Sequence, residues 1–309
     1  MFYALKQISK AYRQACEVYF DDLSKLVIMS DCHRGDGSLA DNFSKNQNIY
    51  FVALTYYEKH KYTYIELGDG EELWENKKIS DIIEMYANIY WLLSQLYHDN
   101  RLFFIYGNHD MVKKKDKYAQ RYLSSYYDVH QKDYAALFPN IKIFESILLK
   151  YAETNKKIFL FHGHQADYMN SRLWKLSRFL VRYLWRPLEL VGVNNPTSAA
   201  KNNKKRKQVE RNLISWSYIH NQMIIAGHTH RAVMPRVGEE LYFNDGSCVH
   251  PRCITAIEIK NGEISLVKWC YKVREDASLY IGKDVLEGPI KLNEYFNNES
   301  TDSILTAGT

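Results

Sequence analysis

The chain contains few cysteines, few prolines and no long hydrophobic run. Its 309 residues include five cysteines and six prolines. No two cysteines are separated by two residues, so the sequence lacks the thiolate pairs that are typical of structural zinc sites. No apolar run approaches the ~20 residues of a membrane span, and the charged N-terminal segment lacks the apolar core of a signal peptide. We therefore expect a cytoplasmic protein with free thiols, with peripheral contact to a membrane left open.

The excess of one charge sign is small. Lys and Arg together number 41 and Asp and Glu 36, which gives a formal net charge of +5. This excess does not favour a nucleic-acid-binding surface. Hydrophobic residues at 46% and charged residues at 25% are typical of a globular protein and exclude a disordered or fibrous chain. A chain of this length can bury a large core without disulfides or metal ions as supports.

Five short apolar segments each end in a polar cluster rich in Asp, His and Gly. Runs of four to six such residues are typical of buried strands. Helical patterns over 43–60 and 79–98 lie between the first three segments, and this alternation predicts βαβ units. Because ligands bind where the carboxyl ends of parallel strands meet, we expect the clusters to form one site. The clusters begin at Asp31, Gly68, Gly107, His162 and Gly227.

The remaining segments differ in pattern. In residues 253–259 and 264–269 the sequence pattern repeats every two residues, as in a β-strand. The two segments flank Asn261-Gly262, a pair typical of tight turns, which predicts a β-hairpin. Helical patterns with a basic stripe predict a helical insertion at about 168–220. We divide the chain into an N-terminal helix (1–22), a main domain (23–280) that contains the insertion, and a C-terminal tail (281–309).

Two lysine-rich runs have open interpretations. We expect the basic run 201–207 to be an exposed loop, with specific binding as the alternative. Residues 113–115 follow the third cluster directly, and we expect a solvated loop there, with attraction of phosphate as the alternative.

Six of the eleven histidines lie in the five clusters, beside carboxylates and an amide. Imidazoles combined with oxygen ligands and without thiolates suit Mn²⁺, Fe²⁺ or Zn²⁺. His228 and His230, one residue apart at a strand end, can address two different ions. A carboxylate such as Asp69 can bridge two ions about 3.5–4 Å apart, a geometry that supports in-line displacement at phosphorus. The clusters therefore indicate a metal centre for phosphoryl chemistry.

The motifs DxH, GDxxE, GNHD, HGH and GHTH occur in this order and resemble those of the calcineurin-like metallophosphoesterase superfamily. The resemblance covers roughly residues 26–271. It implies an α/β fold, a four-layer α/β/β/α sandwich with a helical cap insertion. It also implies a dinuclear metal-dependent hydrolase of phosphodiester, pyrophosphate or phosphomonoester bonds that uses a metal-bridging hydroxide as nucleophile.

The resemblance further implies roles for individual residues. The cofactors would be two divalent metal ions, Mn²⁺ first, with Fe²⁺, Zn²⁺ or Ni²⁺ as alternatives. His109 would face the phosphate and stabilise or protonate the leaving oxygen, and Glu72 would orient His109. The first ion would be bound by Asp31, His33, Asp69 and His230, and the second by Asp69, Asn108, His162 and His228.

A narrower resemblance concerns residues 68–74, which are similar to the GDxxExW segment of the UDP-2,3-diacylglucosamine hydrolase branch. That branch also carries a helical cap between its fourth and fifth motifs. This chain departs from the branch at several positions. Gly70 and Glu71 replace apolar residues, His109 stands where close relatives often have Arg, and His164 stands where they often have Asp. These differences put the specific substrate in question.

We expect a phosphorylated small-molecule or amphipathic substrate under the insertion, with His164, Arg178 and Arg182 as candidate contacts. The basic helix around Arg178 has three interpretations: an amphipathic cap helix, a contact with lipid headgroups or acyl chains, and a nucleic-acid contact. Two other functions stay open. A protein serine/threonine phosphatase shares the core but lacks a large helical cap, and a non-catalytic scaffold would normally have lost a ligand position.

Overall fold

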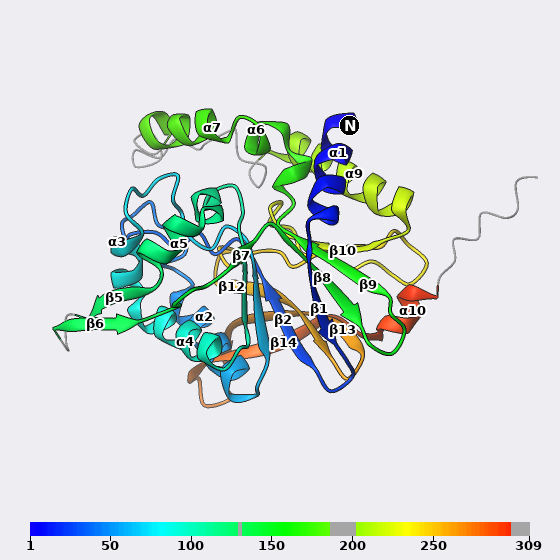
Figure 1. Ribbon diagram of the computed structural model, residues 1–309. Helices are drawn as coiled ribbons and strands as arrows, with labels where there is room; N and C mark the ends of the chain where they lie inside the picture. Colours follow the sequence, from blue (N-terminus) through cyan, green and yellow to red (C-terminus); the bar gives the residue numbers. More distant parts are fainter. Residues whose placement is uncertain (129–131, 186–201, 298–309) are drawn as a thin grey trace, which may run out of the picture.

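The protein is described by a computed structural model that covers residues 1–128, 132–185 and 202–297. Its strands form two main sheets (Figure 1). The five-stranded sheet has the order β1 (Cys16–Phe20), β8 (Ser146–Tyr151), β9 (Lys157–Phe161), β10 (Met223–Ala226) and β11 (Tyr242–Asn244). The seven-stranded sheet has the order β14 (Leu279–Lys291), β13 (Glu263–Val273), β12 (Cys253–Lys260), β2 (Lys25–Met29), β3 (Thr63–Leu67), β4 (Leu102–Ile105) and β7 (Ile143–Phe144).

The helices connect and cover these sheets, and a small separate sheet pairs β5 (Ser125–Asp128) with β6 (Asp133–Ala136). The helices are α1 (Phe2–Arg13), α2 (Gln47–Lys59), α3 (Ile79–Met85), α4 (Ala87–His98), α5 (Asp116–Tyr122), α6 (Tyr168–Ser171), α7 (Trp174–Leu180), α9 (Asn203–His220) and α10 (Leu292–Phe296), with shorter helical turns at Met111–Lys114, His164–Ala166 and Val181–Trp185.

The layers follow from the alternation of side chains along each buried strand. In β2, Leu26 and Ile28 pack between the two sheets, whereas Val27 and Met29 pack against α2, α3 and α4. In β9, Phe159 packs instead against α1 and α9 on the other outer face. The order is therefore helices, seven-stranded sheet, five-stranded sheet, helices (Figure 1). This confirms the expected α/β fold, a four-layer α/β/β/α sandwich.

Parallel pairing brings the carboxyl ends of several strands to one edge. Strands β2, β3 and β4 are parallel neighbours, and so are β9, β10 and β11. Each of the five polar clusters directly follows one of these strands. The predicted hairpin is also confirmed, because β12 and β13 pair around Asn261 (φ 54°) and Gly262 (φ 68°), the two turn positions that need positive φ.

The predicted boundaries differ from the structure at both ends. The helix expected over 1–22 ends at Arg13, and Cys16–Phe20 forms strand β1, because its alternating side chains pair in parallel with β8. The tail expected over 281–309 begins too early, because Leu279–Lys291 forms strand β14 against β13. Tyr295 in α10 is buried in the core between the sheets. Residues 298–309 lie outside the described residues.

The insertion expected over 168–220 is also shorter than predicted. Helix α9 belongs to an outer layer of the sandwich, since Val209, Leu213 and Trp216 form an apolar face against the five-stranded sheet. We call residues 168–185, with α6 and α7, the cap segment; residues 186–201 lie outside the described residues.

The basic run is helical where it is described. Asn202 caps α9 by accepting the backbone N–H groups of Lys204 and Lys205, so residues 203–207 form the start of that helix and not a loop. In the described parts of the chain, no helix combines the length and the hydropathy needed to cross a bilayer.

Candidate metal centre

The backbone at the strand ends is held in an uncommon conformation. Five of the seven predicted ligands have left-handed φ values: Asp31 (51°), His33 (49°), Asp69 (52°), His228 (67°) and His230 (55°). Non-glycine residues in this region cost roughly 1–3 kcal/mol each and concentrate at functional sites. Hydrogen bonds between neighbouring strand ends hold the loops, such as the one from the His33 N–H to the Asp69 carbonyl at 2.9 Å. The strain and its support mark this edge as a site.

Glycine is required where the loops pack closely. Gly68 has a φ of 93°, and a Cβ there would lie 2.8 Å from the backbone nitrogen of Gly107 and from the ring of His162. A Cβ on Gly107 would lie 2.1 Å from an Asp69 carboxylate oxygen. The motif glycines therefore allow three loops to bring their side chains into one cluster.

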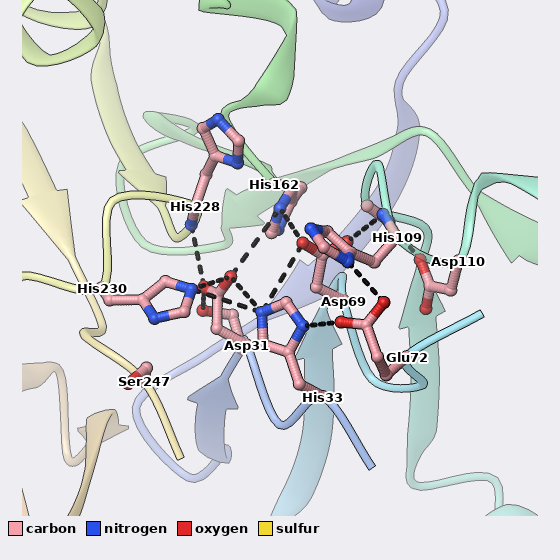
Figure 2. A network of polar contacts seen from close by, with 12 residues as sticks. Asp31, His33, Asp69, Glu72, His109, Asp110, His162, His228, His230 and Ser247 are labelled. Carbon is pink, nitrogen blue, oxygen red and sulfur yellow. Dashed lines mark hydrogen bonds and ion pairs between the residues drawn. The ribbon is translucent and has the colours of Figure 1, made fainter. Parts of the chain in front are cut away.

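The first donor group contains Asp31, His33 and His230 (Figure 2). His33 Nδ1 lies 2.8 Å from Glu72 Oε2. An ionised carboxylate only accepts, so Nδ1 carries the proton and Nε2 keeps a lone pair. That Nε2 faces His230 Nε2 at 3.3 Å, and His230 Nε2 lies 3.0 Å from Asp31 Oδ1. Three donor atoms thus converge on one point.

The second donor group contains Asp69, His162 and His228. His162 Nδ1 donates to the Leu67 carbonyl at 2.8 Å, so Nε2, which lies 3.1 Å from Asp69 Oδ2, is the ring nitrogen that can ligate once it is deprotonated. Asn108 is fully buried, and neither its amide oxygen nor its amide nitrogen has a hydrogen-bond partner. Asp69 also belongs to a third group with His33 and His109, so it lies between the two sides of the cluster.

The donor set fits divalent cations. Asn108 Oδ1 is buried and lacks a hydrogen-bond partner, and buried Asp31 Oδ1 and His162 Nε2 face only other possible donors. A buried polar atom without a partner is costly and calls for an explanation. Carboxylate, amide and imidazole donors are the ligands that first-row divalent metals bind. A cation would satisfy these atoms together.

The electrostatics point in the same direction. Burial lowers the pKa of His162, but the charges of Asp69 and Asp31 outweigh burial and raise it to about 9. Burial raises the pKa of Asp69, but His162, His109 and His33 hold it well below its ordinary value. Without a metal, a proton on His162 helps to balance these carboxylates. A cation would take its place.

His109 lies at the open side of this cluster, where its side chain is 21% exposed. Its Nδ1 lies 2.7 Å from Glu72 Oε1, and its ring stacks on Trp74 with 4.1 Å between centroids. Glu72 therefore contacts both His33 and His109 through its two oxygens (Figure 2). Burial raises the pKa of Glu72, but the two histidines outweigh it and lower the value to about 2.

His164 lies beside the cluster but is 3% exposed. Its ring centroid is 5.6 Å from that of His162. Burial and the nearby imidazoles of His162 and His228 lower its pKa well below the ordinary value. His164 is therefore a neutral, buried side chain next to the second donor group.

The two arginines proposed as substrate contacts lie in the cap segment, outside the donor cluster. Arg182 donates from Nε to the Trp74 carbonyl and from Nη2 to the Leu73 carbonyl, each at 2.8 Å. The Arg178 guanidinium lies 5.1 Å from the ring centroid of Trp174. Arg182 thus ties the cap segment to the loop that carries Glu72, and Arg178 packs within the cap segment.

A buried ion network behind the cluster was missed by the sequence analysis. Lys113, expected in a solvated loop, is 2% exposed and lies 2.5 Å from Glu71 Oε2 and 2.7 Å from Asp110 Oδ2. Arg34 lies 2.8 Å from both Glu71 and Glu66. The expected solvated position is wrong for Lys113, which pairs with Asp110 and Glu71, whereas Lys114 and Lys115 are exposed. The charged residue at position 71, unusual for the branch, was the only signal in the sequence.

Asp167 was also missed. Its buried carboxylate lies 3.4 Å from His228 Nε2 and 2.9 Å from Lys205 Nζ. Burial raises its pKa, but the contacts with His228 and Lys205 outweigh it and lower the value to about 2. Nothing in the sequence around Asp167 indicated either partner.

Fold and site together define a class, a four-layer sandwich protein with a candidate divalent-metal centre at its strand ends. The chain belongs to the calcineurin-like phosphoesterase family, whose model matches residues 24–232. Membership implies hydrolysis of phosphoesters. No curated protein sequence matches the chain.

Solved structures of low identity align with most of the chain. Chaetomium thermophilum Vps29 is 10% identical over 86% of this chain and 96% of its own, with a TM-score of 0.37. The cold-active protein-tyrosine phosphatase of a psychrophile, Shewanella sp., is 14% identical over 89% of this chain and 84% of its own, with a TM-score of 0.39. These TM-scores are too low to support any statement about activity.

Proposed function

We propose that this protein hydrolyses phosphoesters with two divalent metal ions, and that Mn²⁺ is the first candidate for both. The observation that supports this is a pair of donor groups around Asp69 whose buried atoms lack other partners. Six of the seven proposed ligands, all except Asn108, occur in overlapping groups of possible metal donors, which argues against a non-catalytic scaffold. The first ion would be bound by Asp31, His33, Asp69 and His230, and the second by Asp69, Asn108, His162 and His228.

The chain's own residues suit proton transfer at the leaving group. When bound, the two cations supply charge that stabilises phosphoryl oxygens and lowers the pKa of water. Glu72 accepts the Nδ1–H of His109, which orients the ring and leaves Nε2 as the nitrogen that faces the reaction. His109 Nε2 is then the atom that gives a proton to the leaving oxygen. Stacking on Trp74 fixes the ring plane during this step.

We propose a phosphorylated small molecule or an amphipathic compound as substrate. The cap segment exposes Leu176 (48%), Phe179 (58%), Tyr183 (58%) and Leu184 (46%) beside the cation of Arg178. Apolar side chains next to a cation suit a substrate with an anionic and an apolar part, or a membrane surface of that kind. The similarity of residues 68–74 to the UDP-2,3-diacylglucosamine hydrolases supports a pyrophosphate-linked amphipathic substrate as a candidate.

Metal counting and a substrate panel test the proposal. Protein that has been stripped of metal and reloaded with Mn²⁺ should bind two ions per chain, and Asp69→Asn should lose both activity and metal. Asp21→Asn, a change outside the site, is the matched control. The panel contains aryl mono- and diesters, nucleotide-sugar pyrophosphates and phosphoserine peptides. Occupancy that never exceeds one, or two bound ions without any hydrolysis, would contradict the proposal. Preference for phosphoserine peptides would identify a protein phosphatase instead.

A further inference from the structure

One buried carboxylate contacts three separate elements beside the metal centre. Asp167 is 4% exposed and precedes α6. Its Oδ1 accepts the Met169 N–H at 3.1 Å and thereby caps that helix. Its Oδ2 lies 2.9 Å from Asn170 Nδ2, 2.9 Å from Lys205 Nζ on α9, and 3.4 Å from His228 Nε2. Asp167 thus joins α6, α9 and the loop after β10.

The contact decides which nitrogen of His228 can act as a ligand. A carboxylate has no proton to donate, so His228 Nε2 carries the hydrogen and donates it to Asp167. Nδ1 then keeps the lone pair. His228 offers a ring nitrogen to the same group as Asp69 and His162. Its backbone N–H also donates to Asp31 Oδ2 at 2.8 Å, so the residue is held from two sides.

The start of the cap segment and the start of α9 meet at this carboxylate. The cap segment begins with α6 directly after Asp167, and the chain returns to the sandwich at α9. Lys205 lies in the first turn of α9, next to the Asn202 cap. Figure 1 shows α6 and the start of α9 above the strand ends. A displacement of either helix therefore moves a charge or a cap at Asp167.

We propose that Asp167 is a positioning residue for His228 and couples the start of the cap segment and the start of α9 to the second metal site. The inference rests on the proposed two-metal function. A carboxylate that accepts the outer N–H of a ligating imidazole fixes the orientation of the ring and raises its donor strength. The first site has a different support, because Glu72 holds His33. Changes at Asp167 should therefore affect one ion and spare the other.

The test is a calorimetric titration of metal-stripped full-length protein with Mn²⁺, which measures the Kd of each ion. Asp167→Asn removes the negative charge but keeps the cap of α6, since Asn and Asp cap helices equally well. We expect the Kd of the second ion to rise by about 10–100-fold and that of the first to stay unchanged. Lys205→Met should raise the second Kd less, by under about tenfold, and should add nothing in the Asp167→Asn background. Lys207→Met, an exposed site on the same helix, is the matched control.

Each outcome decides the matter. Wild-type affinity for the second ion in Asp167→Asn overturns the inference, and so does an equal loss at both sites. If Asp167→Asn does not fold, Lys205→Met decides, and a wild-type second Kd in that variant overturns the coupling. A wild-type protein that never binds two ions refutes the proposed function, and the inference falls with it. Two ions in the wild type and no selective effect in the variants refute the inference alone.

Discussion

Lys113→Met should destabilise the protein strongly, because Lys113 is part of the buried ion network behind the metal centre. The side chain is 1% exposed, and its Nζ lies 2.5 Å from Glu71 and 2.7 Å from Asp110. Methionine has a similar length and keeps the space filled. Both carboxylates, however, lose their common cation and stay buried.

The size of the effect follows from the pairing of Glu71. Burial raises the pKa of Glu71, but Lys113 and Arg34 outweigh it and lower the value to about 2 from the ordinary 4.5. At about 1.36 kcal/mol for each pKa unit, this difference corresponds to roughly 3 kcal/mol. Removing one partner of a buried ion pair costs about 3–5 kcal/mol. We expect Lys113→Met to lower the free energy of unfolding by ~3 kcal/mol at neutral pH.

The effect should depend on pH with a defined sign. A carboxyl group with a lowered pKa stabilises the fold above its unfolded value of 4.5, and this contribution is lost as the pH falls from 4.5 towards about 2. Lys113→Met lacks the part of that contribution that comes from Lys113, while Arg34 keeps its contact with Glu71. The difference between wild type and variant should therefore be largest near neutral pH and smaller at pH 4.

Urea unfolding of metal-stripped protein measures the free energies directly. The control is Lys115→Met, a neighbouring exposed lysine, which should change the stability by less than about 0.5 kcal/mol. A loss below about 1 kcal/mol in Lys113→Met, or a loss equal to that of the control, would refute the reasoning.

Three further predictions concern the centre and its surroundings. His109→Ala should keep both metal ions and slow turnover by about 10²–10⁴-fold, with a smaller loss for substrates whose leaving groups need no proton; metal analysis and a leaving-group series check this, and equal metal loss would contradict it. Because the pKa of His162 is raised to about 9 in the metal-free protein, a cation displaces a proton below that pH. The apparent Mn²⁺ affinity should therefore increase from pH 6 to pH 9, and a flat titration series would contradict this. Arg182→Ala should lower kcat/KM even for a small aryl phosphodiester, because Arg182 supports the loop that carries Glu72; Arg178→Ala should spare that substrate, and steady-state kinetics with equal losses in both variants would refute the distinction.

Local pattern was sufficient for the strands and for the polar clusters that follow them. The apolar run of β2 ends at Met29, two residues before Asp31, and the run of β10 ends at Ala226, two residues before His228. A short apolar segment that is followed by polar residues is enough to predict a buried strand, and both features can be read from the local sequence. Asn261-Gly262 likewise determines its hairpin locally, since both residues adopt positive φ. The polar strand ends could therefore be located before any contact was known, and the resemblance of the five motifs to a family then suggested the metal donors.

Pairing between distant segments decided the edges of the fold. Residues 16–20 continue an amphipathic pattern that suits a helix or a strand, and they form a strand because β8, some 130 residues further along the chain, offers an edge. Residues 203–220 suit either a cap helix or a layer helix, and Trp216 is buried because β9 and α1 enclose it. The hydrophobic periodicity of a segment cannot distinguish these alternatives, because it carries no information about the distant segment that the residues pack against.

The sequence by itself determined the buried strands and the polar clusters that follow them, since both are properties of the local chain. Only the tertiary structure decided the states of the charged groups around them. Lys113 is buried because Glu71, 42 residues away, meets it, and Asp167 reaches His228 from 61 residues away. Burial, pairing and pKa depend on the atoms that surround a charge, and distant segments supply those atoms only when the chain has folded.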